Sequence, residues 1–440
     1  MRLFWYLLVA PMTAVGVITG AILFQSHAAL SPVLESADQQ HVPLASTQSL
    51  EDLITIRDRL LSEIEKQPPT LIAAASGLGG PTPSAITHQL HAVAVRIEIE
   101  EMARENLSKA FKLAEEAVRL GNKTTLTSAT QAELQRLYQL WDQAVAALSE
   151  IPEESFLSQQ AIAKRREYEA NRAYVGYYYD TIRSGFLKKI AESTGLGDRV
   201  HLTVCNLQRE CRRLRGNQPP ASPASLIKVP VAIALMAKLA AENISPETKI
   251  LVSPGNWTED AGKIWVGSEY SLRAIMADMI SYSGNIATNQ LIDYLGFDYI
   301  NRVMRDRGYN TTRVNTKLVG ESTYPANLGT GPNVLTTDEL TDMMVGIYNN
   351  EHPGDDLILD ALVKQYDWEL GYEAIKRPAV WIGEKTGQNS KVLGTTVGVN
   401  IQGERYIITV AINYTGSEPA VKQAVKGVVD HLIRHRGFGG

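Results

Sequence analysis

The 440-residue sequence predicts a mixed α/β (α+β) fold for residues 177–440, preceded by an all-α region and an apolar amino-terminal segment. Strand patterns lie at both ends of residues 177–440, and helical patterns lie between them. Two of the late strand patterns are separated by Gly403-Glu404, which is a hairpin signal. We therefore expect strands from the two ends to meet in one sheet within one domain.

The composition excludes several classes of protein. With 44% hydrophobic and 21% charged residues, the chain is close to globular averages. The 43 Lys and Arg residues against 48 Asp and Glu leave a net charge of −5. That charge argues against a nucleic-acid partner, which would need a broad cationic face. Only two cysteines occur, so a disulfide-dense scaffold and a four-thiolate zinc site are excluded, while one disulfide remains possible.

The amino terminus carries a membrane-targeting pattern. An uncharged stretch, Leu3 to Phe24, follows Arg2, and the next charged residue is Glu35. This stretch can span a bilayer core at about 1.5 Å per residue, and the preceding positive charge places the amino terminus in the cytoplasm. We expect residues 3–24 to anchor the chain in the inner membrane and the remainder to be periplasmic, or otherwise extracytoplasmic.

A cleaved signal peptide over residues 1–28 is the alternative, because Ser26-His27-Ala28 offers small residues near a cleavage point. The apolar run exceeds the usual signal-peptide core of about 7 to 15 residues, which favours the retained anchor. Either route leads to an oxidising compartment, where Cys205 and Cys211 could pair across a hairpin. The sequence leaves that pairing open.

Residues 29–49 are polar, contain Pro32 and Pro43, and are typical of a linker. Apolar residues then recur at helical spacing, so residues 50–170 are predicted to be mostly amphipathic helix. One stripe, Leu134 to Leu148, is expected to form a face of an intrachain helical hairpin. The alternative is that this helical region docks an unknown protein.

The segments that follow justify the mixed fold. A helix is expected over Tyr177 to Ala191 and a strand over Val200 to Asn206. Late strands are expected over Lys391 to Gln402 and Arg405 to Tyr414. The last periodic segment, Ala420 to Ile433, is predicted to be a helix.

Three short motifs carry candidate chemistry. Ser225-Leu226-Ile227-Lys228 is the only S-x-x-K and opens an apolar helical run, so the lysine amine and the serine hydroxyl share one face. Serine is a weak nucleophile that needs an adjacent base, and a lysine serves as one only when its pKa is lowered. Lys385-Thr386-Gly387 offers a second cation that would lower it, and a glycine that would let a substrate approach the strand. Ser283-Gly284-Asn285 offers a hydroxyl and an amide.

The order S-x-x-K, S-x-N, K-T-G and the spacings between these motifs resemble the penicillin-recognising serine hydrolases, most nearly the class A β-lactamases. The resemblance covers roughly residue 177 to the carboxyl terminus and none of residues 1–170. It implies an antiparallel sheet flanked by helices, of the β-lactamase and D-alanyl peptidase type. It implies no metal and no other cofactor.

The resemblance also implies roles for individual residues. Ser225 would be the acylated nucleophile, Lys228 its base, and Ser283 the hydroxyl that relays a proton to the leaving nitrogen. Lys385 and Thr386 would bind a substrate carboxylate.

The remaining implied roles concern the substrate carbonyl. Asn285 would hold the acyl-amide carbonyl and steady Lys228. The backbone N–H groups of Ser225 and Gln388 would form the oxyanion hole, beside Gly387.

The sequence departs from that family in two places. The usual S-D-N is Ser283-Gly284-Asn285 here, which removes a buried carboxylate that braces the loop. The E-x-x-L-N pattern that activates the deacylating water is absent between Asn310 and Thr337. Leu318 falls where the glutamate is expected, and the nearest carboxylate, Glu321, is either a displaced base or, as we favour, a solvated loop acid.

These observations predict a hydrolase that opens β-lactam rings through an acyl-enzyme on Ser225. One alternative is a penicillin-binding-protein-like D-alanyl peptidase acting on peptidoglycan peptides, which shares the acylation step. The other is a non-catalytic envelope interaction protein. The presence of Ser225, Lys228 and Ser283 together argues against the last, because a binding module needs no such arrangement.

Overall fold

The computed structural model describes residues 47–66, 83–259 and 262–439. The predicted anchor or signal segment and nearly all of the predicted linker lie outside the described residues. Among the described helices, one stretch, Ala224–Glu242, is long and apolar enough to cross a membrane, but most of it is buried inside the protein. The chain divides into two compact units at Glu101 and Met102.

The first unit contains helix α1 (Leu50–Glu65) and the beginning of α2 (Pro83–Gly121). Helix α1 begins at the N-cap Ser49, whose side chain accepts a hydrogen bond from the Asp52 backbone at 3.1 Å. Leu53 and Leu60 are its buried residues, seven positions apart on one face. The helical spacing predicted for this segment is confirmed.

The second unit begins with the rest of α2, followed by α3 (Gln131–Ser149) and α4 (Ser158–Ile182). A capping box between Thr130 and Glu133 starts α3. The predicted stripe on α3 is buried against the other two helices, in a cluster that includes Leu137, Leu140, Trp141, Ala144, Leu148, Ala110, Ala117, Tyr168 and Val175. This stripe therefore packs within the chain, as the hairpin interpretation expects.

The single helix predicted over Tyr177 to Ala191 is wrong, because the chain breaks between α4 and α5 (Gly185–Ser193). Ser184 lies at the break, where its hydroxyl donates to the Asp180 carbonyl and accepts from the Arg213 backbone N–H at 2.7 Å. This second bond ties the junction to a strand. The predicted division between residues 170 and 177 falls inside α4, which continues to Ile182.

The main sheet is antiparallel and has five strands in the order β2-β1-β7-β6-β5. Strands β1 (Val200–Asn206) and β2 (Cys211–Leu214) come from the start of this region, and β5 (Ala379–Asn389), β6 (Val392–Ile401) and β7 (Glu404–Asn413) from its end. The predicted meeting of both ends in one sheet is confirmed. The β6–β7 turn is Gln402-Gly403 rather than Gly403-Glu404, since these two residues have the positive φ values, 55° and 97°, of a tight hairpin turn.

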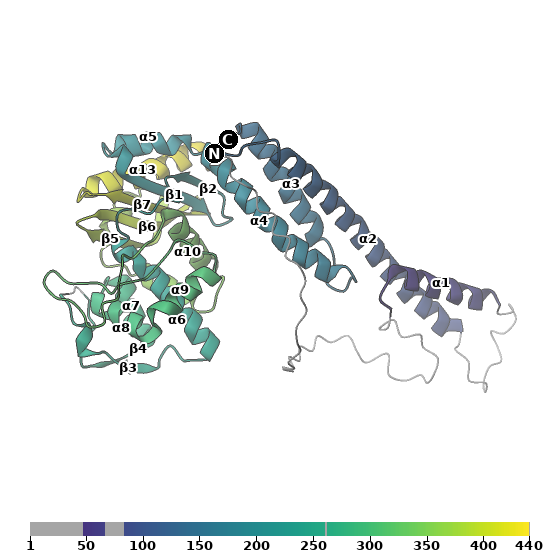
Figure 1. Ribbon diagram of the computed structural model, residues 1–440, viewed down its shortest axis with the longest axis horizontal. Coiled ribbons are helices and arrows are strands. Elements are labelled where there is room, and N and C mark those ends of the chain that lie inside the picture. Colours follow the sequence, from purple (N-terminus) through teal and green to yellow (C-terminus); the bar gives the residue numbers. More distant parts are fainter. Residues whose placement is uncertain (1–46, 67–82, 260–261, 440) are drawn as a thin grey trace. The chain divides into compact units, whose positions relative to one another are not determined.

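Helices cover both faces of this sheet (Figure 1). Helices α5 and α13 (Glu418–His435) pack on one face. The other face carries a helical layer made of α6 (Lys228–Glu242), α7 (Leu272–Ser281), α8 (Asn285–Leu295), α9 (Phe297–Asp306), α10 (Thr337–Asn349) and α11 (Asp355–Leu362). The short helix α12 (Glu369–Tyr372) precedes β5, and β3 (Lys249–Leu251) pairs with β4 (Glu269–Ser271) in a second small sheet.

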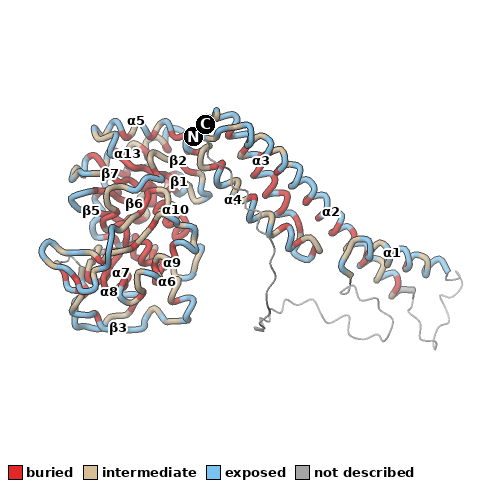
Figure 2. Tube along the Cα trace, viewed as in Figure 1, coloured by how far each residue is buried: buried red, intermediate tan, exposed pale blue. Residues whose placement is uncertain are grey.

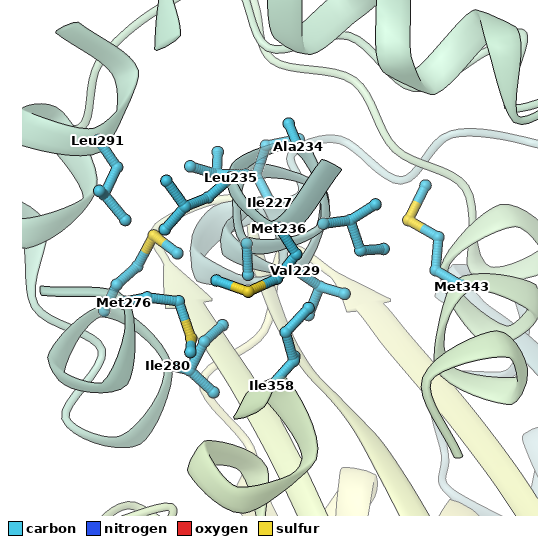
Figure 3. Close-up of a cluster of buried hydrophobic side chains, with 14 of the residues drawn as sticks. Ile227, Val229, Ala234, Leu235, Met236, Met276, Ile280, Leu291, Met343 and Ile358 are labelled. Carbon is cyan, nitrogen blue, oxygen red and sulfur yellow. The ribbon is translucent and has the colours of Figure 1, made fainter. Parts of the chain in front are cut away.

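Helix α6 runs through the middle of the helical layer, which is why it is apolar on nearly all sides. Figure 2 shows the buried residues concentrated in the sheet and in the helices against it. In Figure 3 the side chains of Val229 and Met236 lie among those of Met276, Ile280 and Ile358 from neighbouring helices. The buried part of α6, residues 228–236, is thus held on all sides, and so is the segment that leads into it.

Asp180 on α4 is the main polar link between that helix and the sheet. Its carboxylate accepts from Arg183 at 3.0 Å, Arg213 at 2.8 Å and the Cys211 backbone N–H at 3.3 Å. Cys211 is in turn disulfide-bonded to Cys205, its pairing partner on β1, so the pairing that the sequence left open is present. Asp180 itself is only 8% exposed.

Replacing Asp180 by Asn should destabilise the protein by about 3 kcal/mol, because it removes the carboxylate shared by the buried Arg212 and the half-buried Arg183 and Arg213. Equilibrium urea unfolding measures the change. The control is Asp142→Asn, which breaks an exposed ion pair with Arg172 and should cost less than about 1 kcal/mol. Equal effects of the two substitutions would contradict this account.

Candidate active site

The S-x-x-K motif lies where a short 3-10 helix, Ala224–Ile227, runs into α6. In a 3-10 helix, side chains three residues apart lie directly above one another, so Ser225 and Lys228 share a side. Lys228 is completely buried, whereas Ser225 is half-buried and lines a cavity. The segment thus presents a hydroxyl to the solvent-accessible space and keeps the amine beneath it.

The Lys228 amine reaches the second predicted motif. Its Nζ donates to Ser283 Oγ at 3.1 Å, to Asn285 Oδ1 at 2.9 Å and to the Ser283 carbonyl. Ser283 has a left-handed backbone with φ of 60°, which is uncommon for a residue with a side chain. The predicted contact between Asn285 and Lys228 is therefore present.

The third motif, Lys385-Thr386-Gly387, also contacts the Ser283 hydroxyl. Lys385 is completely buried on β5, and its Nζ donates to Ser283 Oγ at 3.0 Å and to the Thr386 carbonyl at 2.9 Å. The Ser283 hydroxyl thus accepts from two lysine amines. Since a hydroxyl has two lone pairs and one hydrogen, its own hydrogen is left for a third group.

Burial changes the acid–base properties of β5. It lowers the pKa of Lys385 to about 7, although the carboxylates of Asp367 and Glu384 act in the opposite direction. Burial also raises the pKa of Glu384 to about 8, against the effect of hydrogen bonds from Trp381 Nε1 at 2.9 Å and the Gly371 N–H at 3.3 Å. Near neutral pH, Lys385 therefore exchanges a proton readily and Glu384 is mainly neutral.

A cavity of about 430 Å³ lies over Ser225. Asn285 and Gln388 of the predicted set also line it. The other lining residues come from the segment before Ser225, the loop after α9 and the β5–β6 turn: Ala221, Ser222, Pro223, Ala224, Thr316, Lys317, Leu318, Val319, Leu328, Pro332, Asn333, Asn389 and Lys391. No aspartate or glutamate is among these described lining residues.

Packing around Gly387 also requires a residue without a side chain. A Cβ there would lie 2.9 Å from Leu226 Cγ and 3.0 Å from the Leu226 backbone nitrogen. The glycine thus lets the nucleophile segment itself pack directly against β5. This packing brings together the two segments that carry the predicted oxyanion-hole N–H groups, those of Ser225 and Gln388.

The expected loss of a buried carboxylate at position 284 is also corrected. A Cβ on Gly284 would overlap the carboxylate of Asp278, which comes from α7 and is 5% exposed. The Asp278 carboxylate also accepts from the Lys263 backbone N–H at 2.6 Å. A carboxylate therefore remains beside the loop, supplied by another element, and the absence of a side chain at 284 makes room for it.

The loop after α9 is fixed through its backbone. Buried Asn289 accepts from the Leu318 N–H and donates to the Leu318 carbonyl, both at 2.8 Å. Asn301 makes a similar pair of bonds with Val314, at 2.8 and 3.0 Å. Leu318 lines the cavity, whereas Glu321 is exposed and is not among the lining residues. The interpretation of Glu321 as a solvated loop acid agrees with this position.

Thr386 contacts residues that the sequence motifs did not reveal. Its hydroxyl donates to Asp367 Oδ2 at 3.2 Å and accepts from Gln365 Nε2 at 3.4 Å. Both partners belong to the loop between α11 and α12, which has no recognisable motif. Asp278 and Asn289 were missed for the same reason, because only the folded chain places them beside the motifs.

Comparison with known proteins agrees with the fold and the motif positions. The sequence profile of the β-lactamase enzyme family matches residues 186–435, which is more than half of the chain. The chain therefore belongs to the β-lactamase enzyme family. No curated protein matches it.

Solved structures share the fold of somewhat more than half of the chain. A β-lactamase from Sphaerobacter thermophilus is 20% identical, with 58% of this chain and 99% of that chain covered and a TM-score of 0.50. The protein PBP-A is 22% identical, with 57% and 97% covered and a TM-score of 0.50. The predicted antiparallel sheet flanked by helices, of the β-lactamase type, is thus confirmed.

The raised pKa of Glu384 predicts a pH-dependent stability. The folded chain keeps a proton on Glu384 that the unfolded chain loses above its ordinary pKa, so the free energy of unfolding should fall as the pH rises from about 5 to 7. Glu384→Gln removes the titrating carboxyl group and should reduce the decrease in the free energy of unfolding over this pH range. Urea unfolding at both pH values measures it, and identical pH dependence in wild type and variant would refute the assignment.

Proposed function

We propose that the protein is a penicillin-binding-protein-like serine acyl-enzyme former, which attacks D-alanyl peptides and β-lactams through Ser225 and releases the acyl group slowly. The observation that supports this proposal is the cavity over Ser225, whose described lining residues include no carboxylate. The cluster in which Lys228 and Lys385 both donate to Ser283 belongs to the same three motifs. The residues expected to act in acylation support the proposal, and the described lining offers no carboxylate to activate a deacylating water.

The acylation step uses the contacts described above. Ser225 Oγ forms a bond to the substrate carbonyl carbon as its proton passes to Lys228. The proton then moves through the Ser283 hydroxyl to the leaving nitrogen as the carbon–nitrogen bond breaks. Lys385 donates to the same hydroxyl and favours its role as a proton relay. The backbone N–H groups of Ser225 and Gln388 would stabilise the oxyanion.

The deacylation step needs a base close to the acyl carbon. The residue that faces the cavity at the expected position is Leu318, whose side chain neither accepts nor donates a proton. Glu321 is exposed instead. Neither residue is placed to act as the base that efficient β-lactam hydrolysis needs. We therefore favour slow release of the acyl group over rapid turnover.

We further propose an extracytoplasmic location with inner-membrane attachment through residues 3–24. The apolar segment after Arg2 supports it, and so does the Cys205–Cys211 disulfide, because disulfides persist mainly in oxidising compartments. A peptidoglycan peptide would be accessible to the site there.

Intact-mass spectrometry with benzylpenicillin tests the proposed function. We expect wild-type protein to gain one penicillin mass that persists after the free drug is removed. Ser225→Ala should gain none, whereas Ser390→Ala, which changes an exposed serine in the β5–β6 turn, should behave as wild type. Absence of any adduct would exclude the function, and an adduct that disappears within seconds would favour a β-lactamase.

Substitutions in the loop after α9 test the reason for slow release. Leu318→Glu places a carboxylate at the cavity and should shorten the lifetime of the adduct at least about tenfold, within the usual contribution of a positioned general base. Glu321→Gln should leave the lifetime unchanged. A longer lifetime in Glu321→Gln would show that Glu321 is the base after all.

A further inference from the structure

The carboxylate of Asp367 contacts Thr386, which was expected to bind a substrate carboxylate. The Thr386 hydroxyl is buried, and it donates its single hydrogen to Asp367 Oδ2 at 3.2 Å. Asp367 itself is exposed, on the loop between α11 and α12. Because a hydroxyl has only one hydrogen, Thr386 cannot donate to a substrate while this contact is made.

The second neighbour of Thr386 is Gln365, which gives one of its two Nε2 hydrogens to the Thr386 oxygen and adds a buried acceptor oxygen. The distance from Nε2 to the Thr386 oxygen is 3.4 Å. The Gln365 Oε1 is buried and has no hydrogen-bond partner among the described residues. The groups around the Thr386 hydroxyl therefore present acceptor oxygens, which suit an N–H donor better than a carboxylate.

The charges around this position point the same way. Lys385 is the nearby cation, and it is already engaged with the Ser283 hydroxyl and the Thr386 carbonyl. The nearby carboxyl groups of Asp367 and Glu384 both raise the pKa of Lys385. An incoming carboxylate would thus meet one partly engaged lysine together with the fixed negative charge of Asp367.

We propose that Asp367 is a specificity-determining residue that disfavours substrates with a free carboxylate beside the scissile amide and favours a neutral or cationic group there. The inference rests on the proposed function. It names the substrate class as peptides whose residue after the scissile bond is amide-linked or amidated, in preference to a free carboxyl-terminal residue.

The test compares the acylation rates of Ser225 by benzylpenicillin and by its methyl ester, which differ in the carboxylate alone. Full-length protein in detergent is followed by intact-mass spectrometry. Asp367→Asn should raise the acid-to-ester ratio of acylation rates by about fivefold or more. A fivefold change in this ratio corresponds to the repulsion between two unit charges about 4 Å apart in water.

Two controls make the outcome specific. Glu369→Gln removes a negative charge two residues further along the chain, at an exposed position, and should leave the ratio unchanged. Thermal unfolding should show that Asp367→Asn is folded. A purely structural role of Asp367 would change both rates equally.

An unchanged ratio in Asp367→Asn, or the same change in Glu369→Gln, overturns the inference while the proposed function stands. If neither compound labels Ser225 in any of the proteins, the proposed function fails, and the inference fails with it.

Discussion

The site depends on one hydroxyl that holds two buried amines together. Ser283 Oγ accepts from Lys228 at 3.1 Å and from Lys385 at 3.0 Å, and both lysines are fully buried. Burial removes the hydration of an ammonium group, and this cost favours the neutral form of the amine. Burial brings the pKa of Lys385 down to about 7, although the carboxyl groups of Asp367 and Glu384 act in the opposite direction. A lysine can act as a base only under such conditions.

The rest of the fold brings the three motifs to this point and keeps them there. The apolar surroundings of α6 fix the nucleophile segment, and the glycine at 387 lets that segment contact β5 directly. Strand β5 is in turn held in the sheet by its long pairing with β6. The left-handed Ser283 then places one side chain between elements that are far apart in the sequence.

The sequence predicted the parts of the structure that depend on local pattern. Strand β1 and helices α1 and α13 follow directly from alternation or helical periodicity, and the three motifs identified the lysine–serine–lysine cluster. Periodicity did not reveal the break at Ser184, where a hydrogen bond ties the chain to a strand 29 residues away.

Other features depend on packing between distant segments, for which one sequence carries no signal. Asp367 is next to Thr386 only because the loop after α11 folds over β5. Asp278 takes the space beside Gly284 only because α7 precedes that loop in the helical layer. The close approach of Leu226 to Gly387 was not anticipated for the same reason.

The attachment of Leu318 has a consequence for how such a site can diversify. Asn289 binds the main chain on both sides of this position and makes no demand on the side chain. Any residue whose side chain tolerates the cavity can therefore occupy the position without refolding of the surrounding loop. The backbone contacts fix the position of residue 318 but not the identity of its side chain. A single substitution at this position can therefore introduce a new reactive group into the cavity.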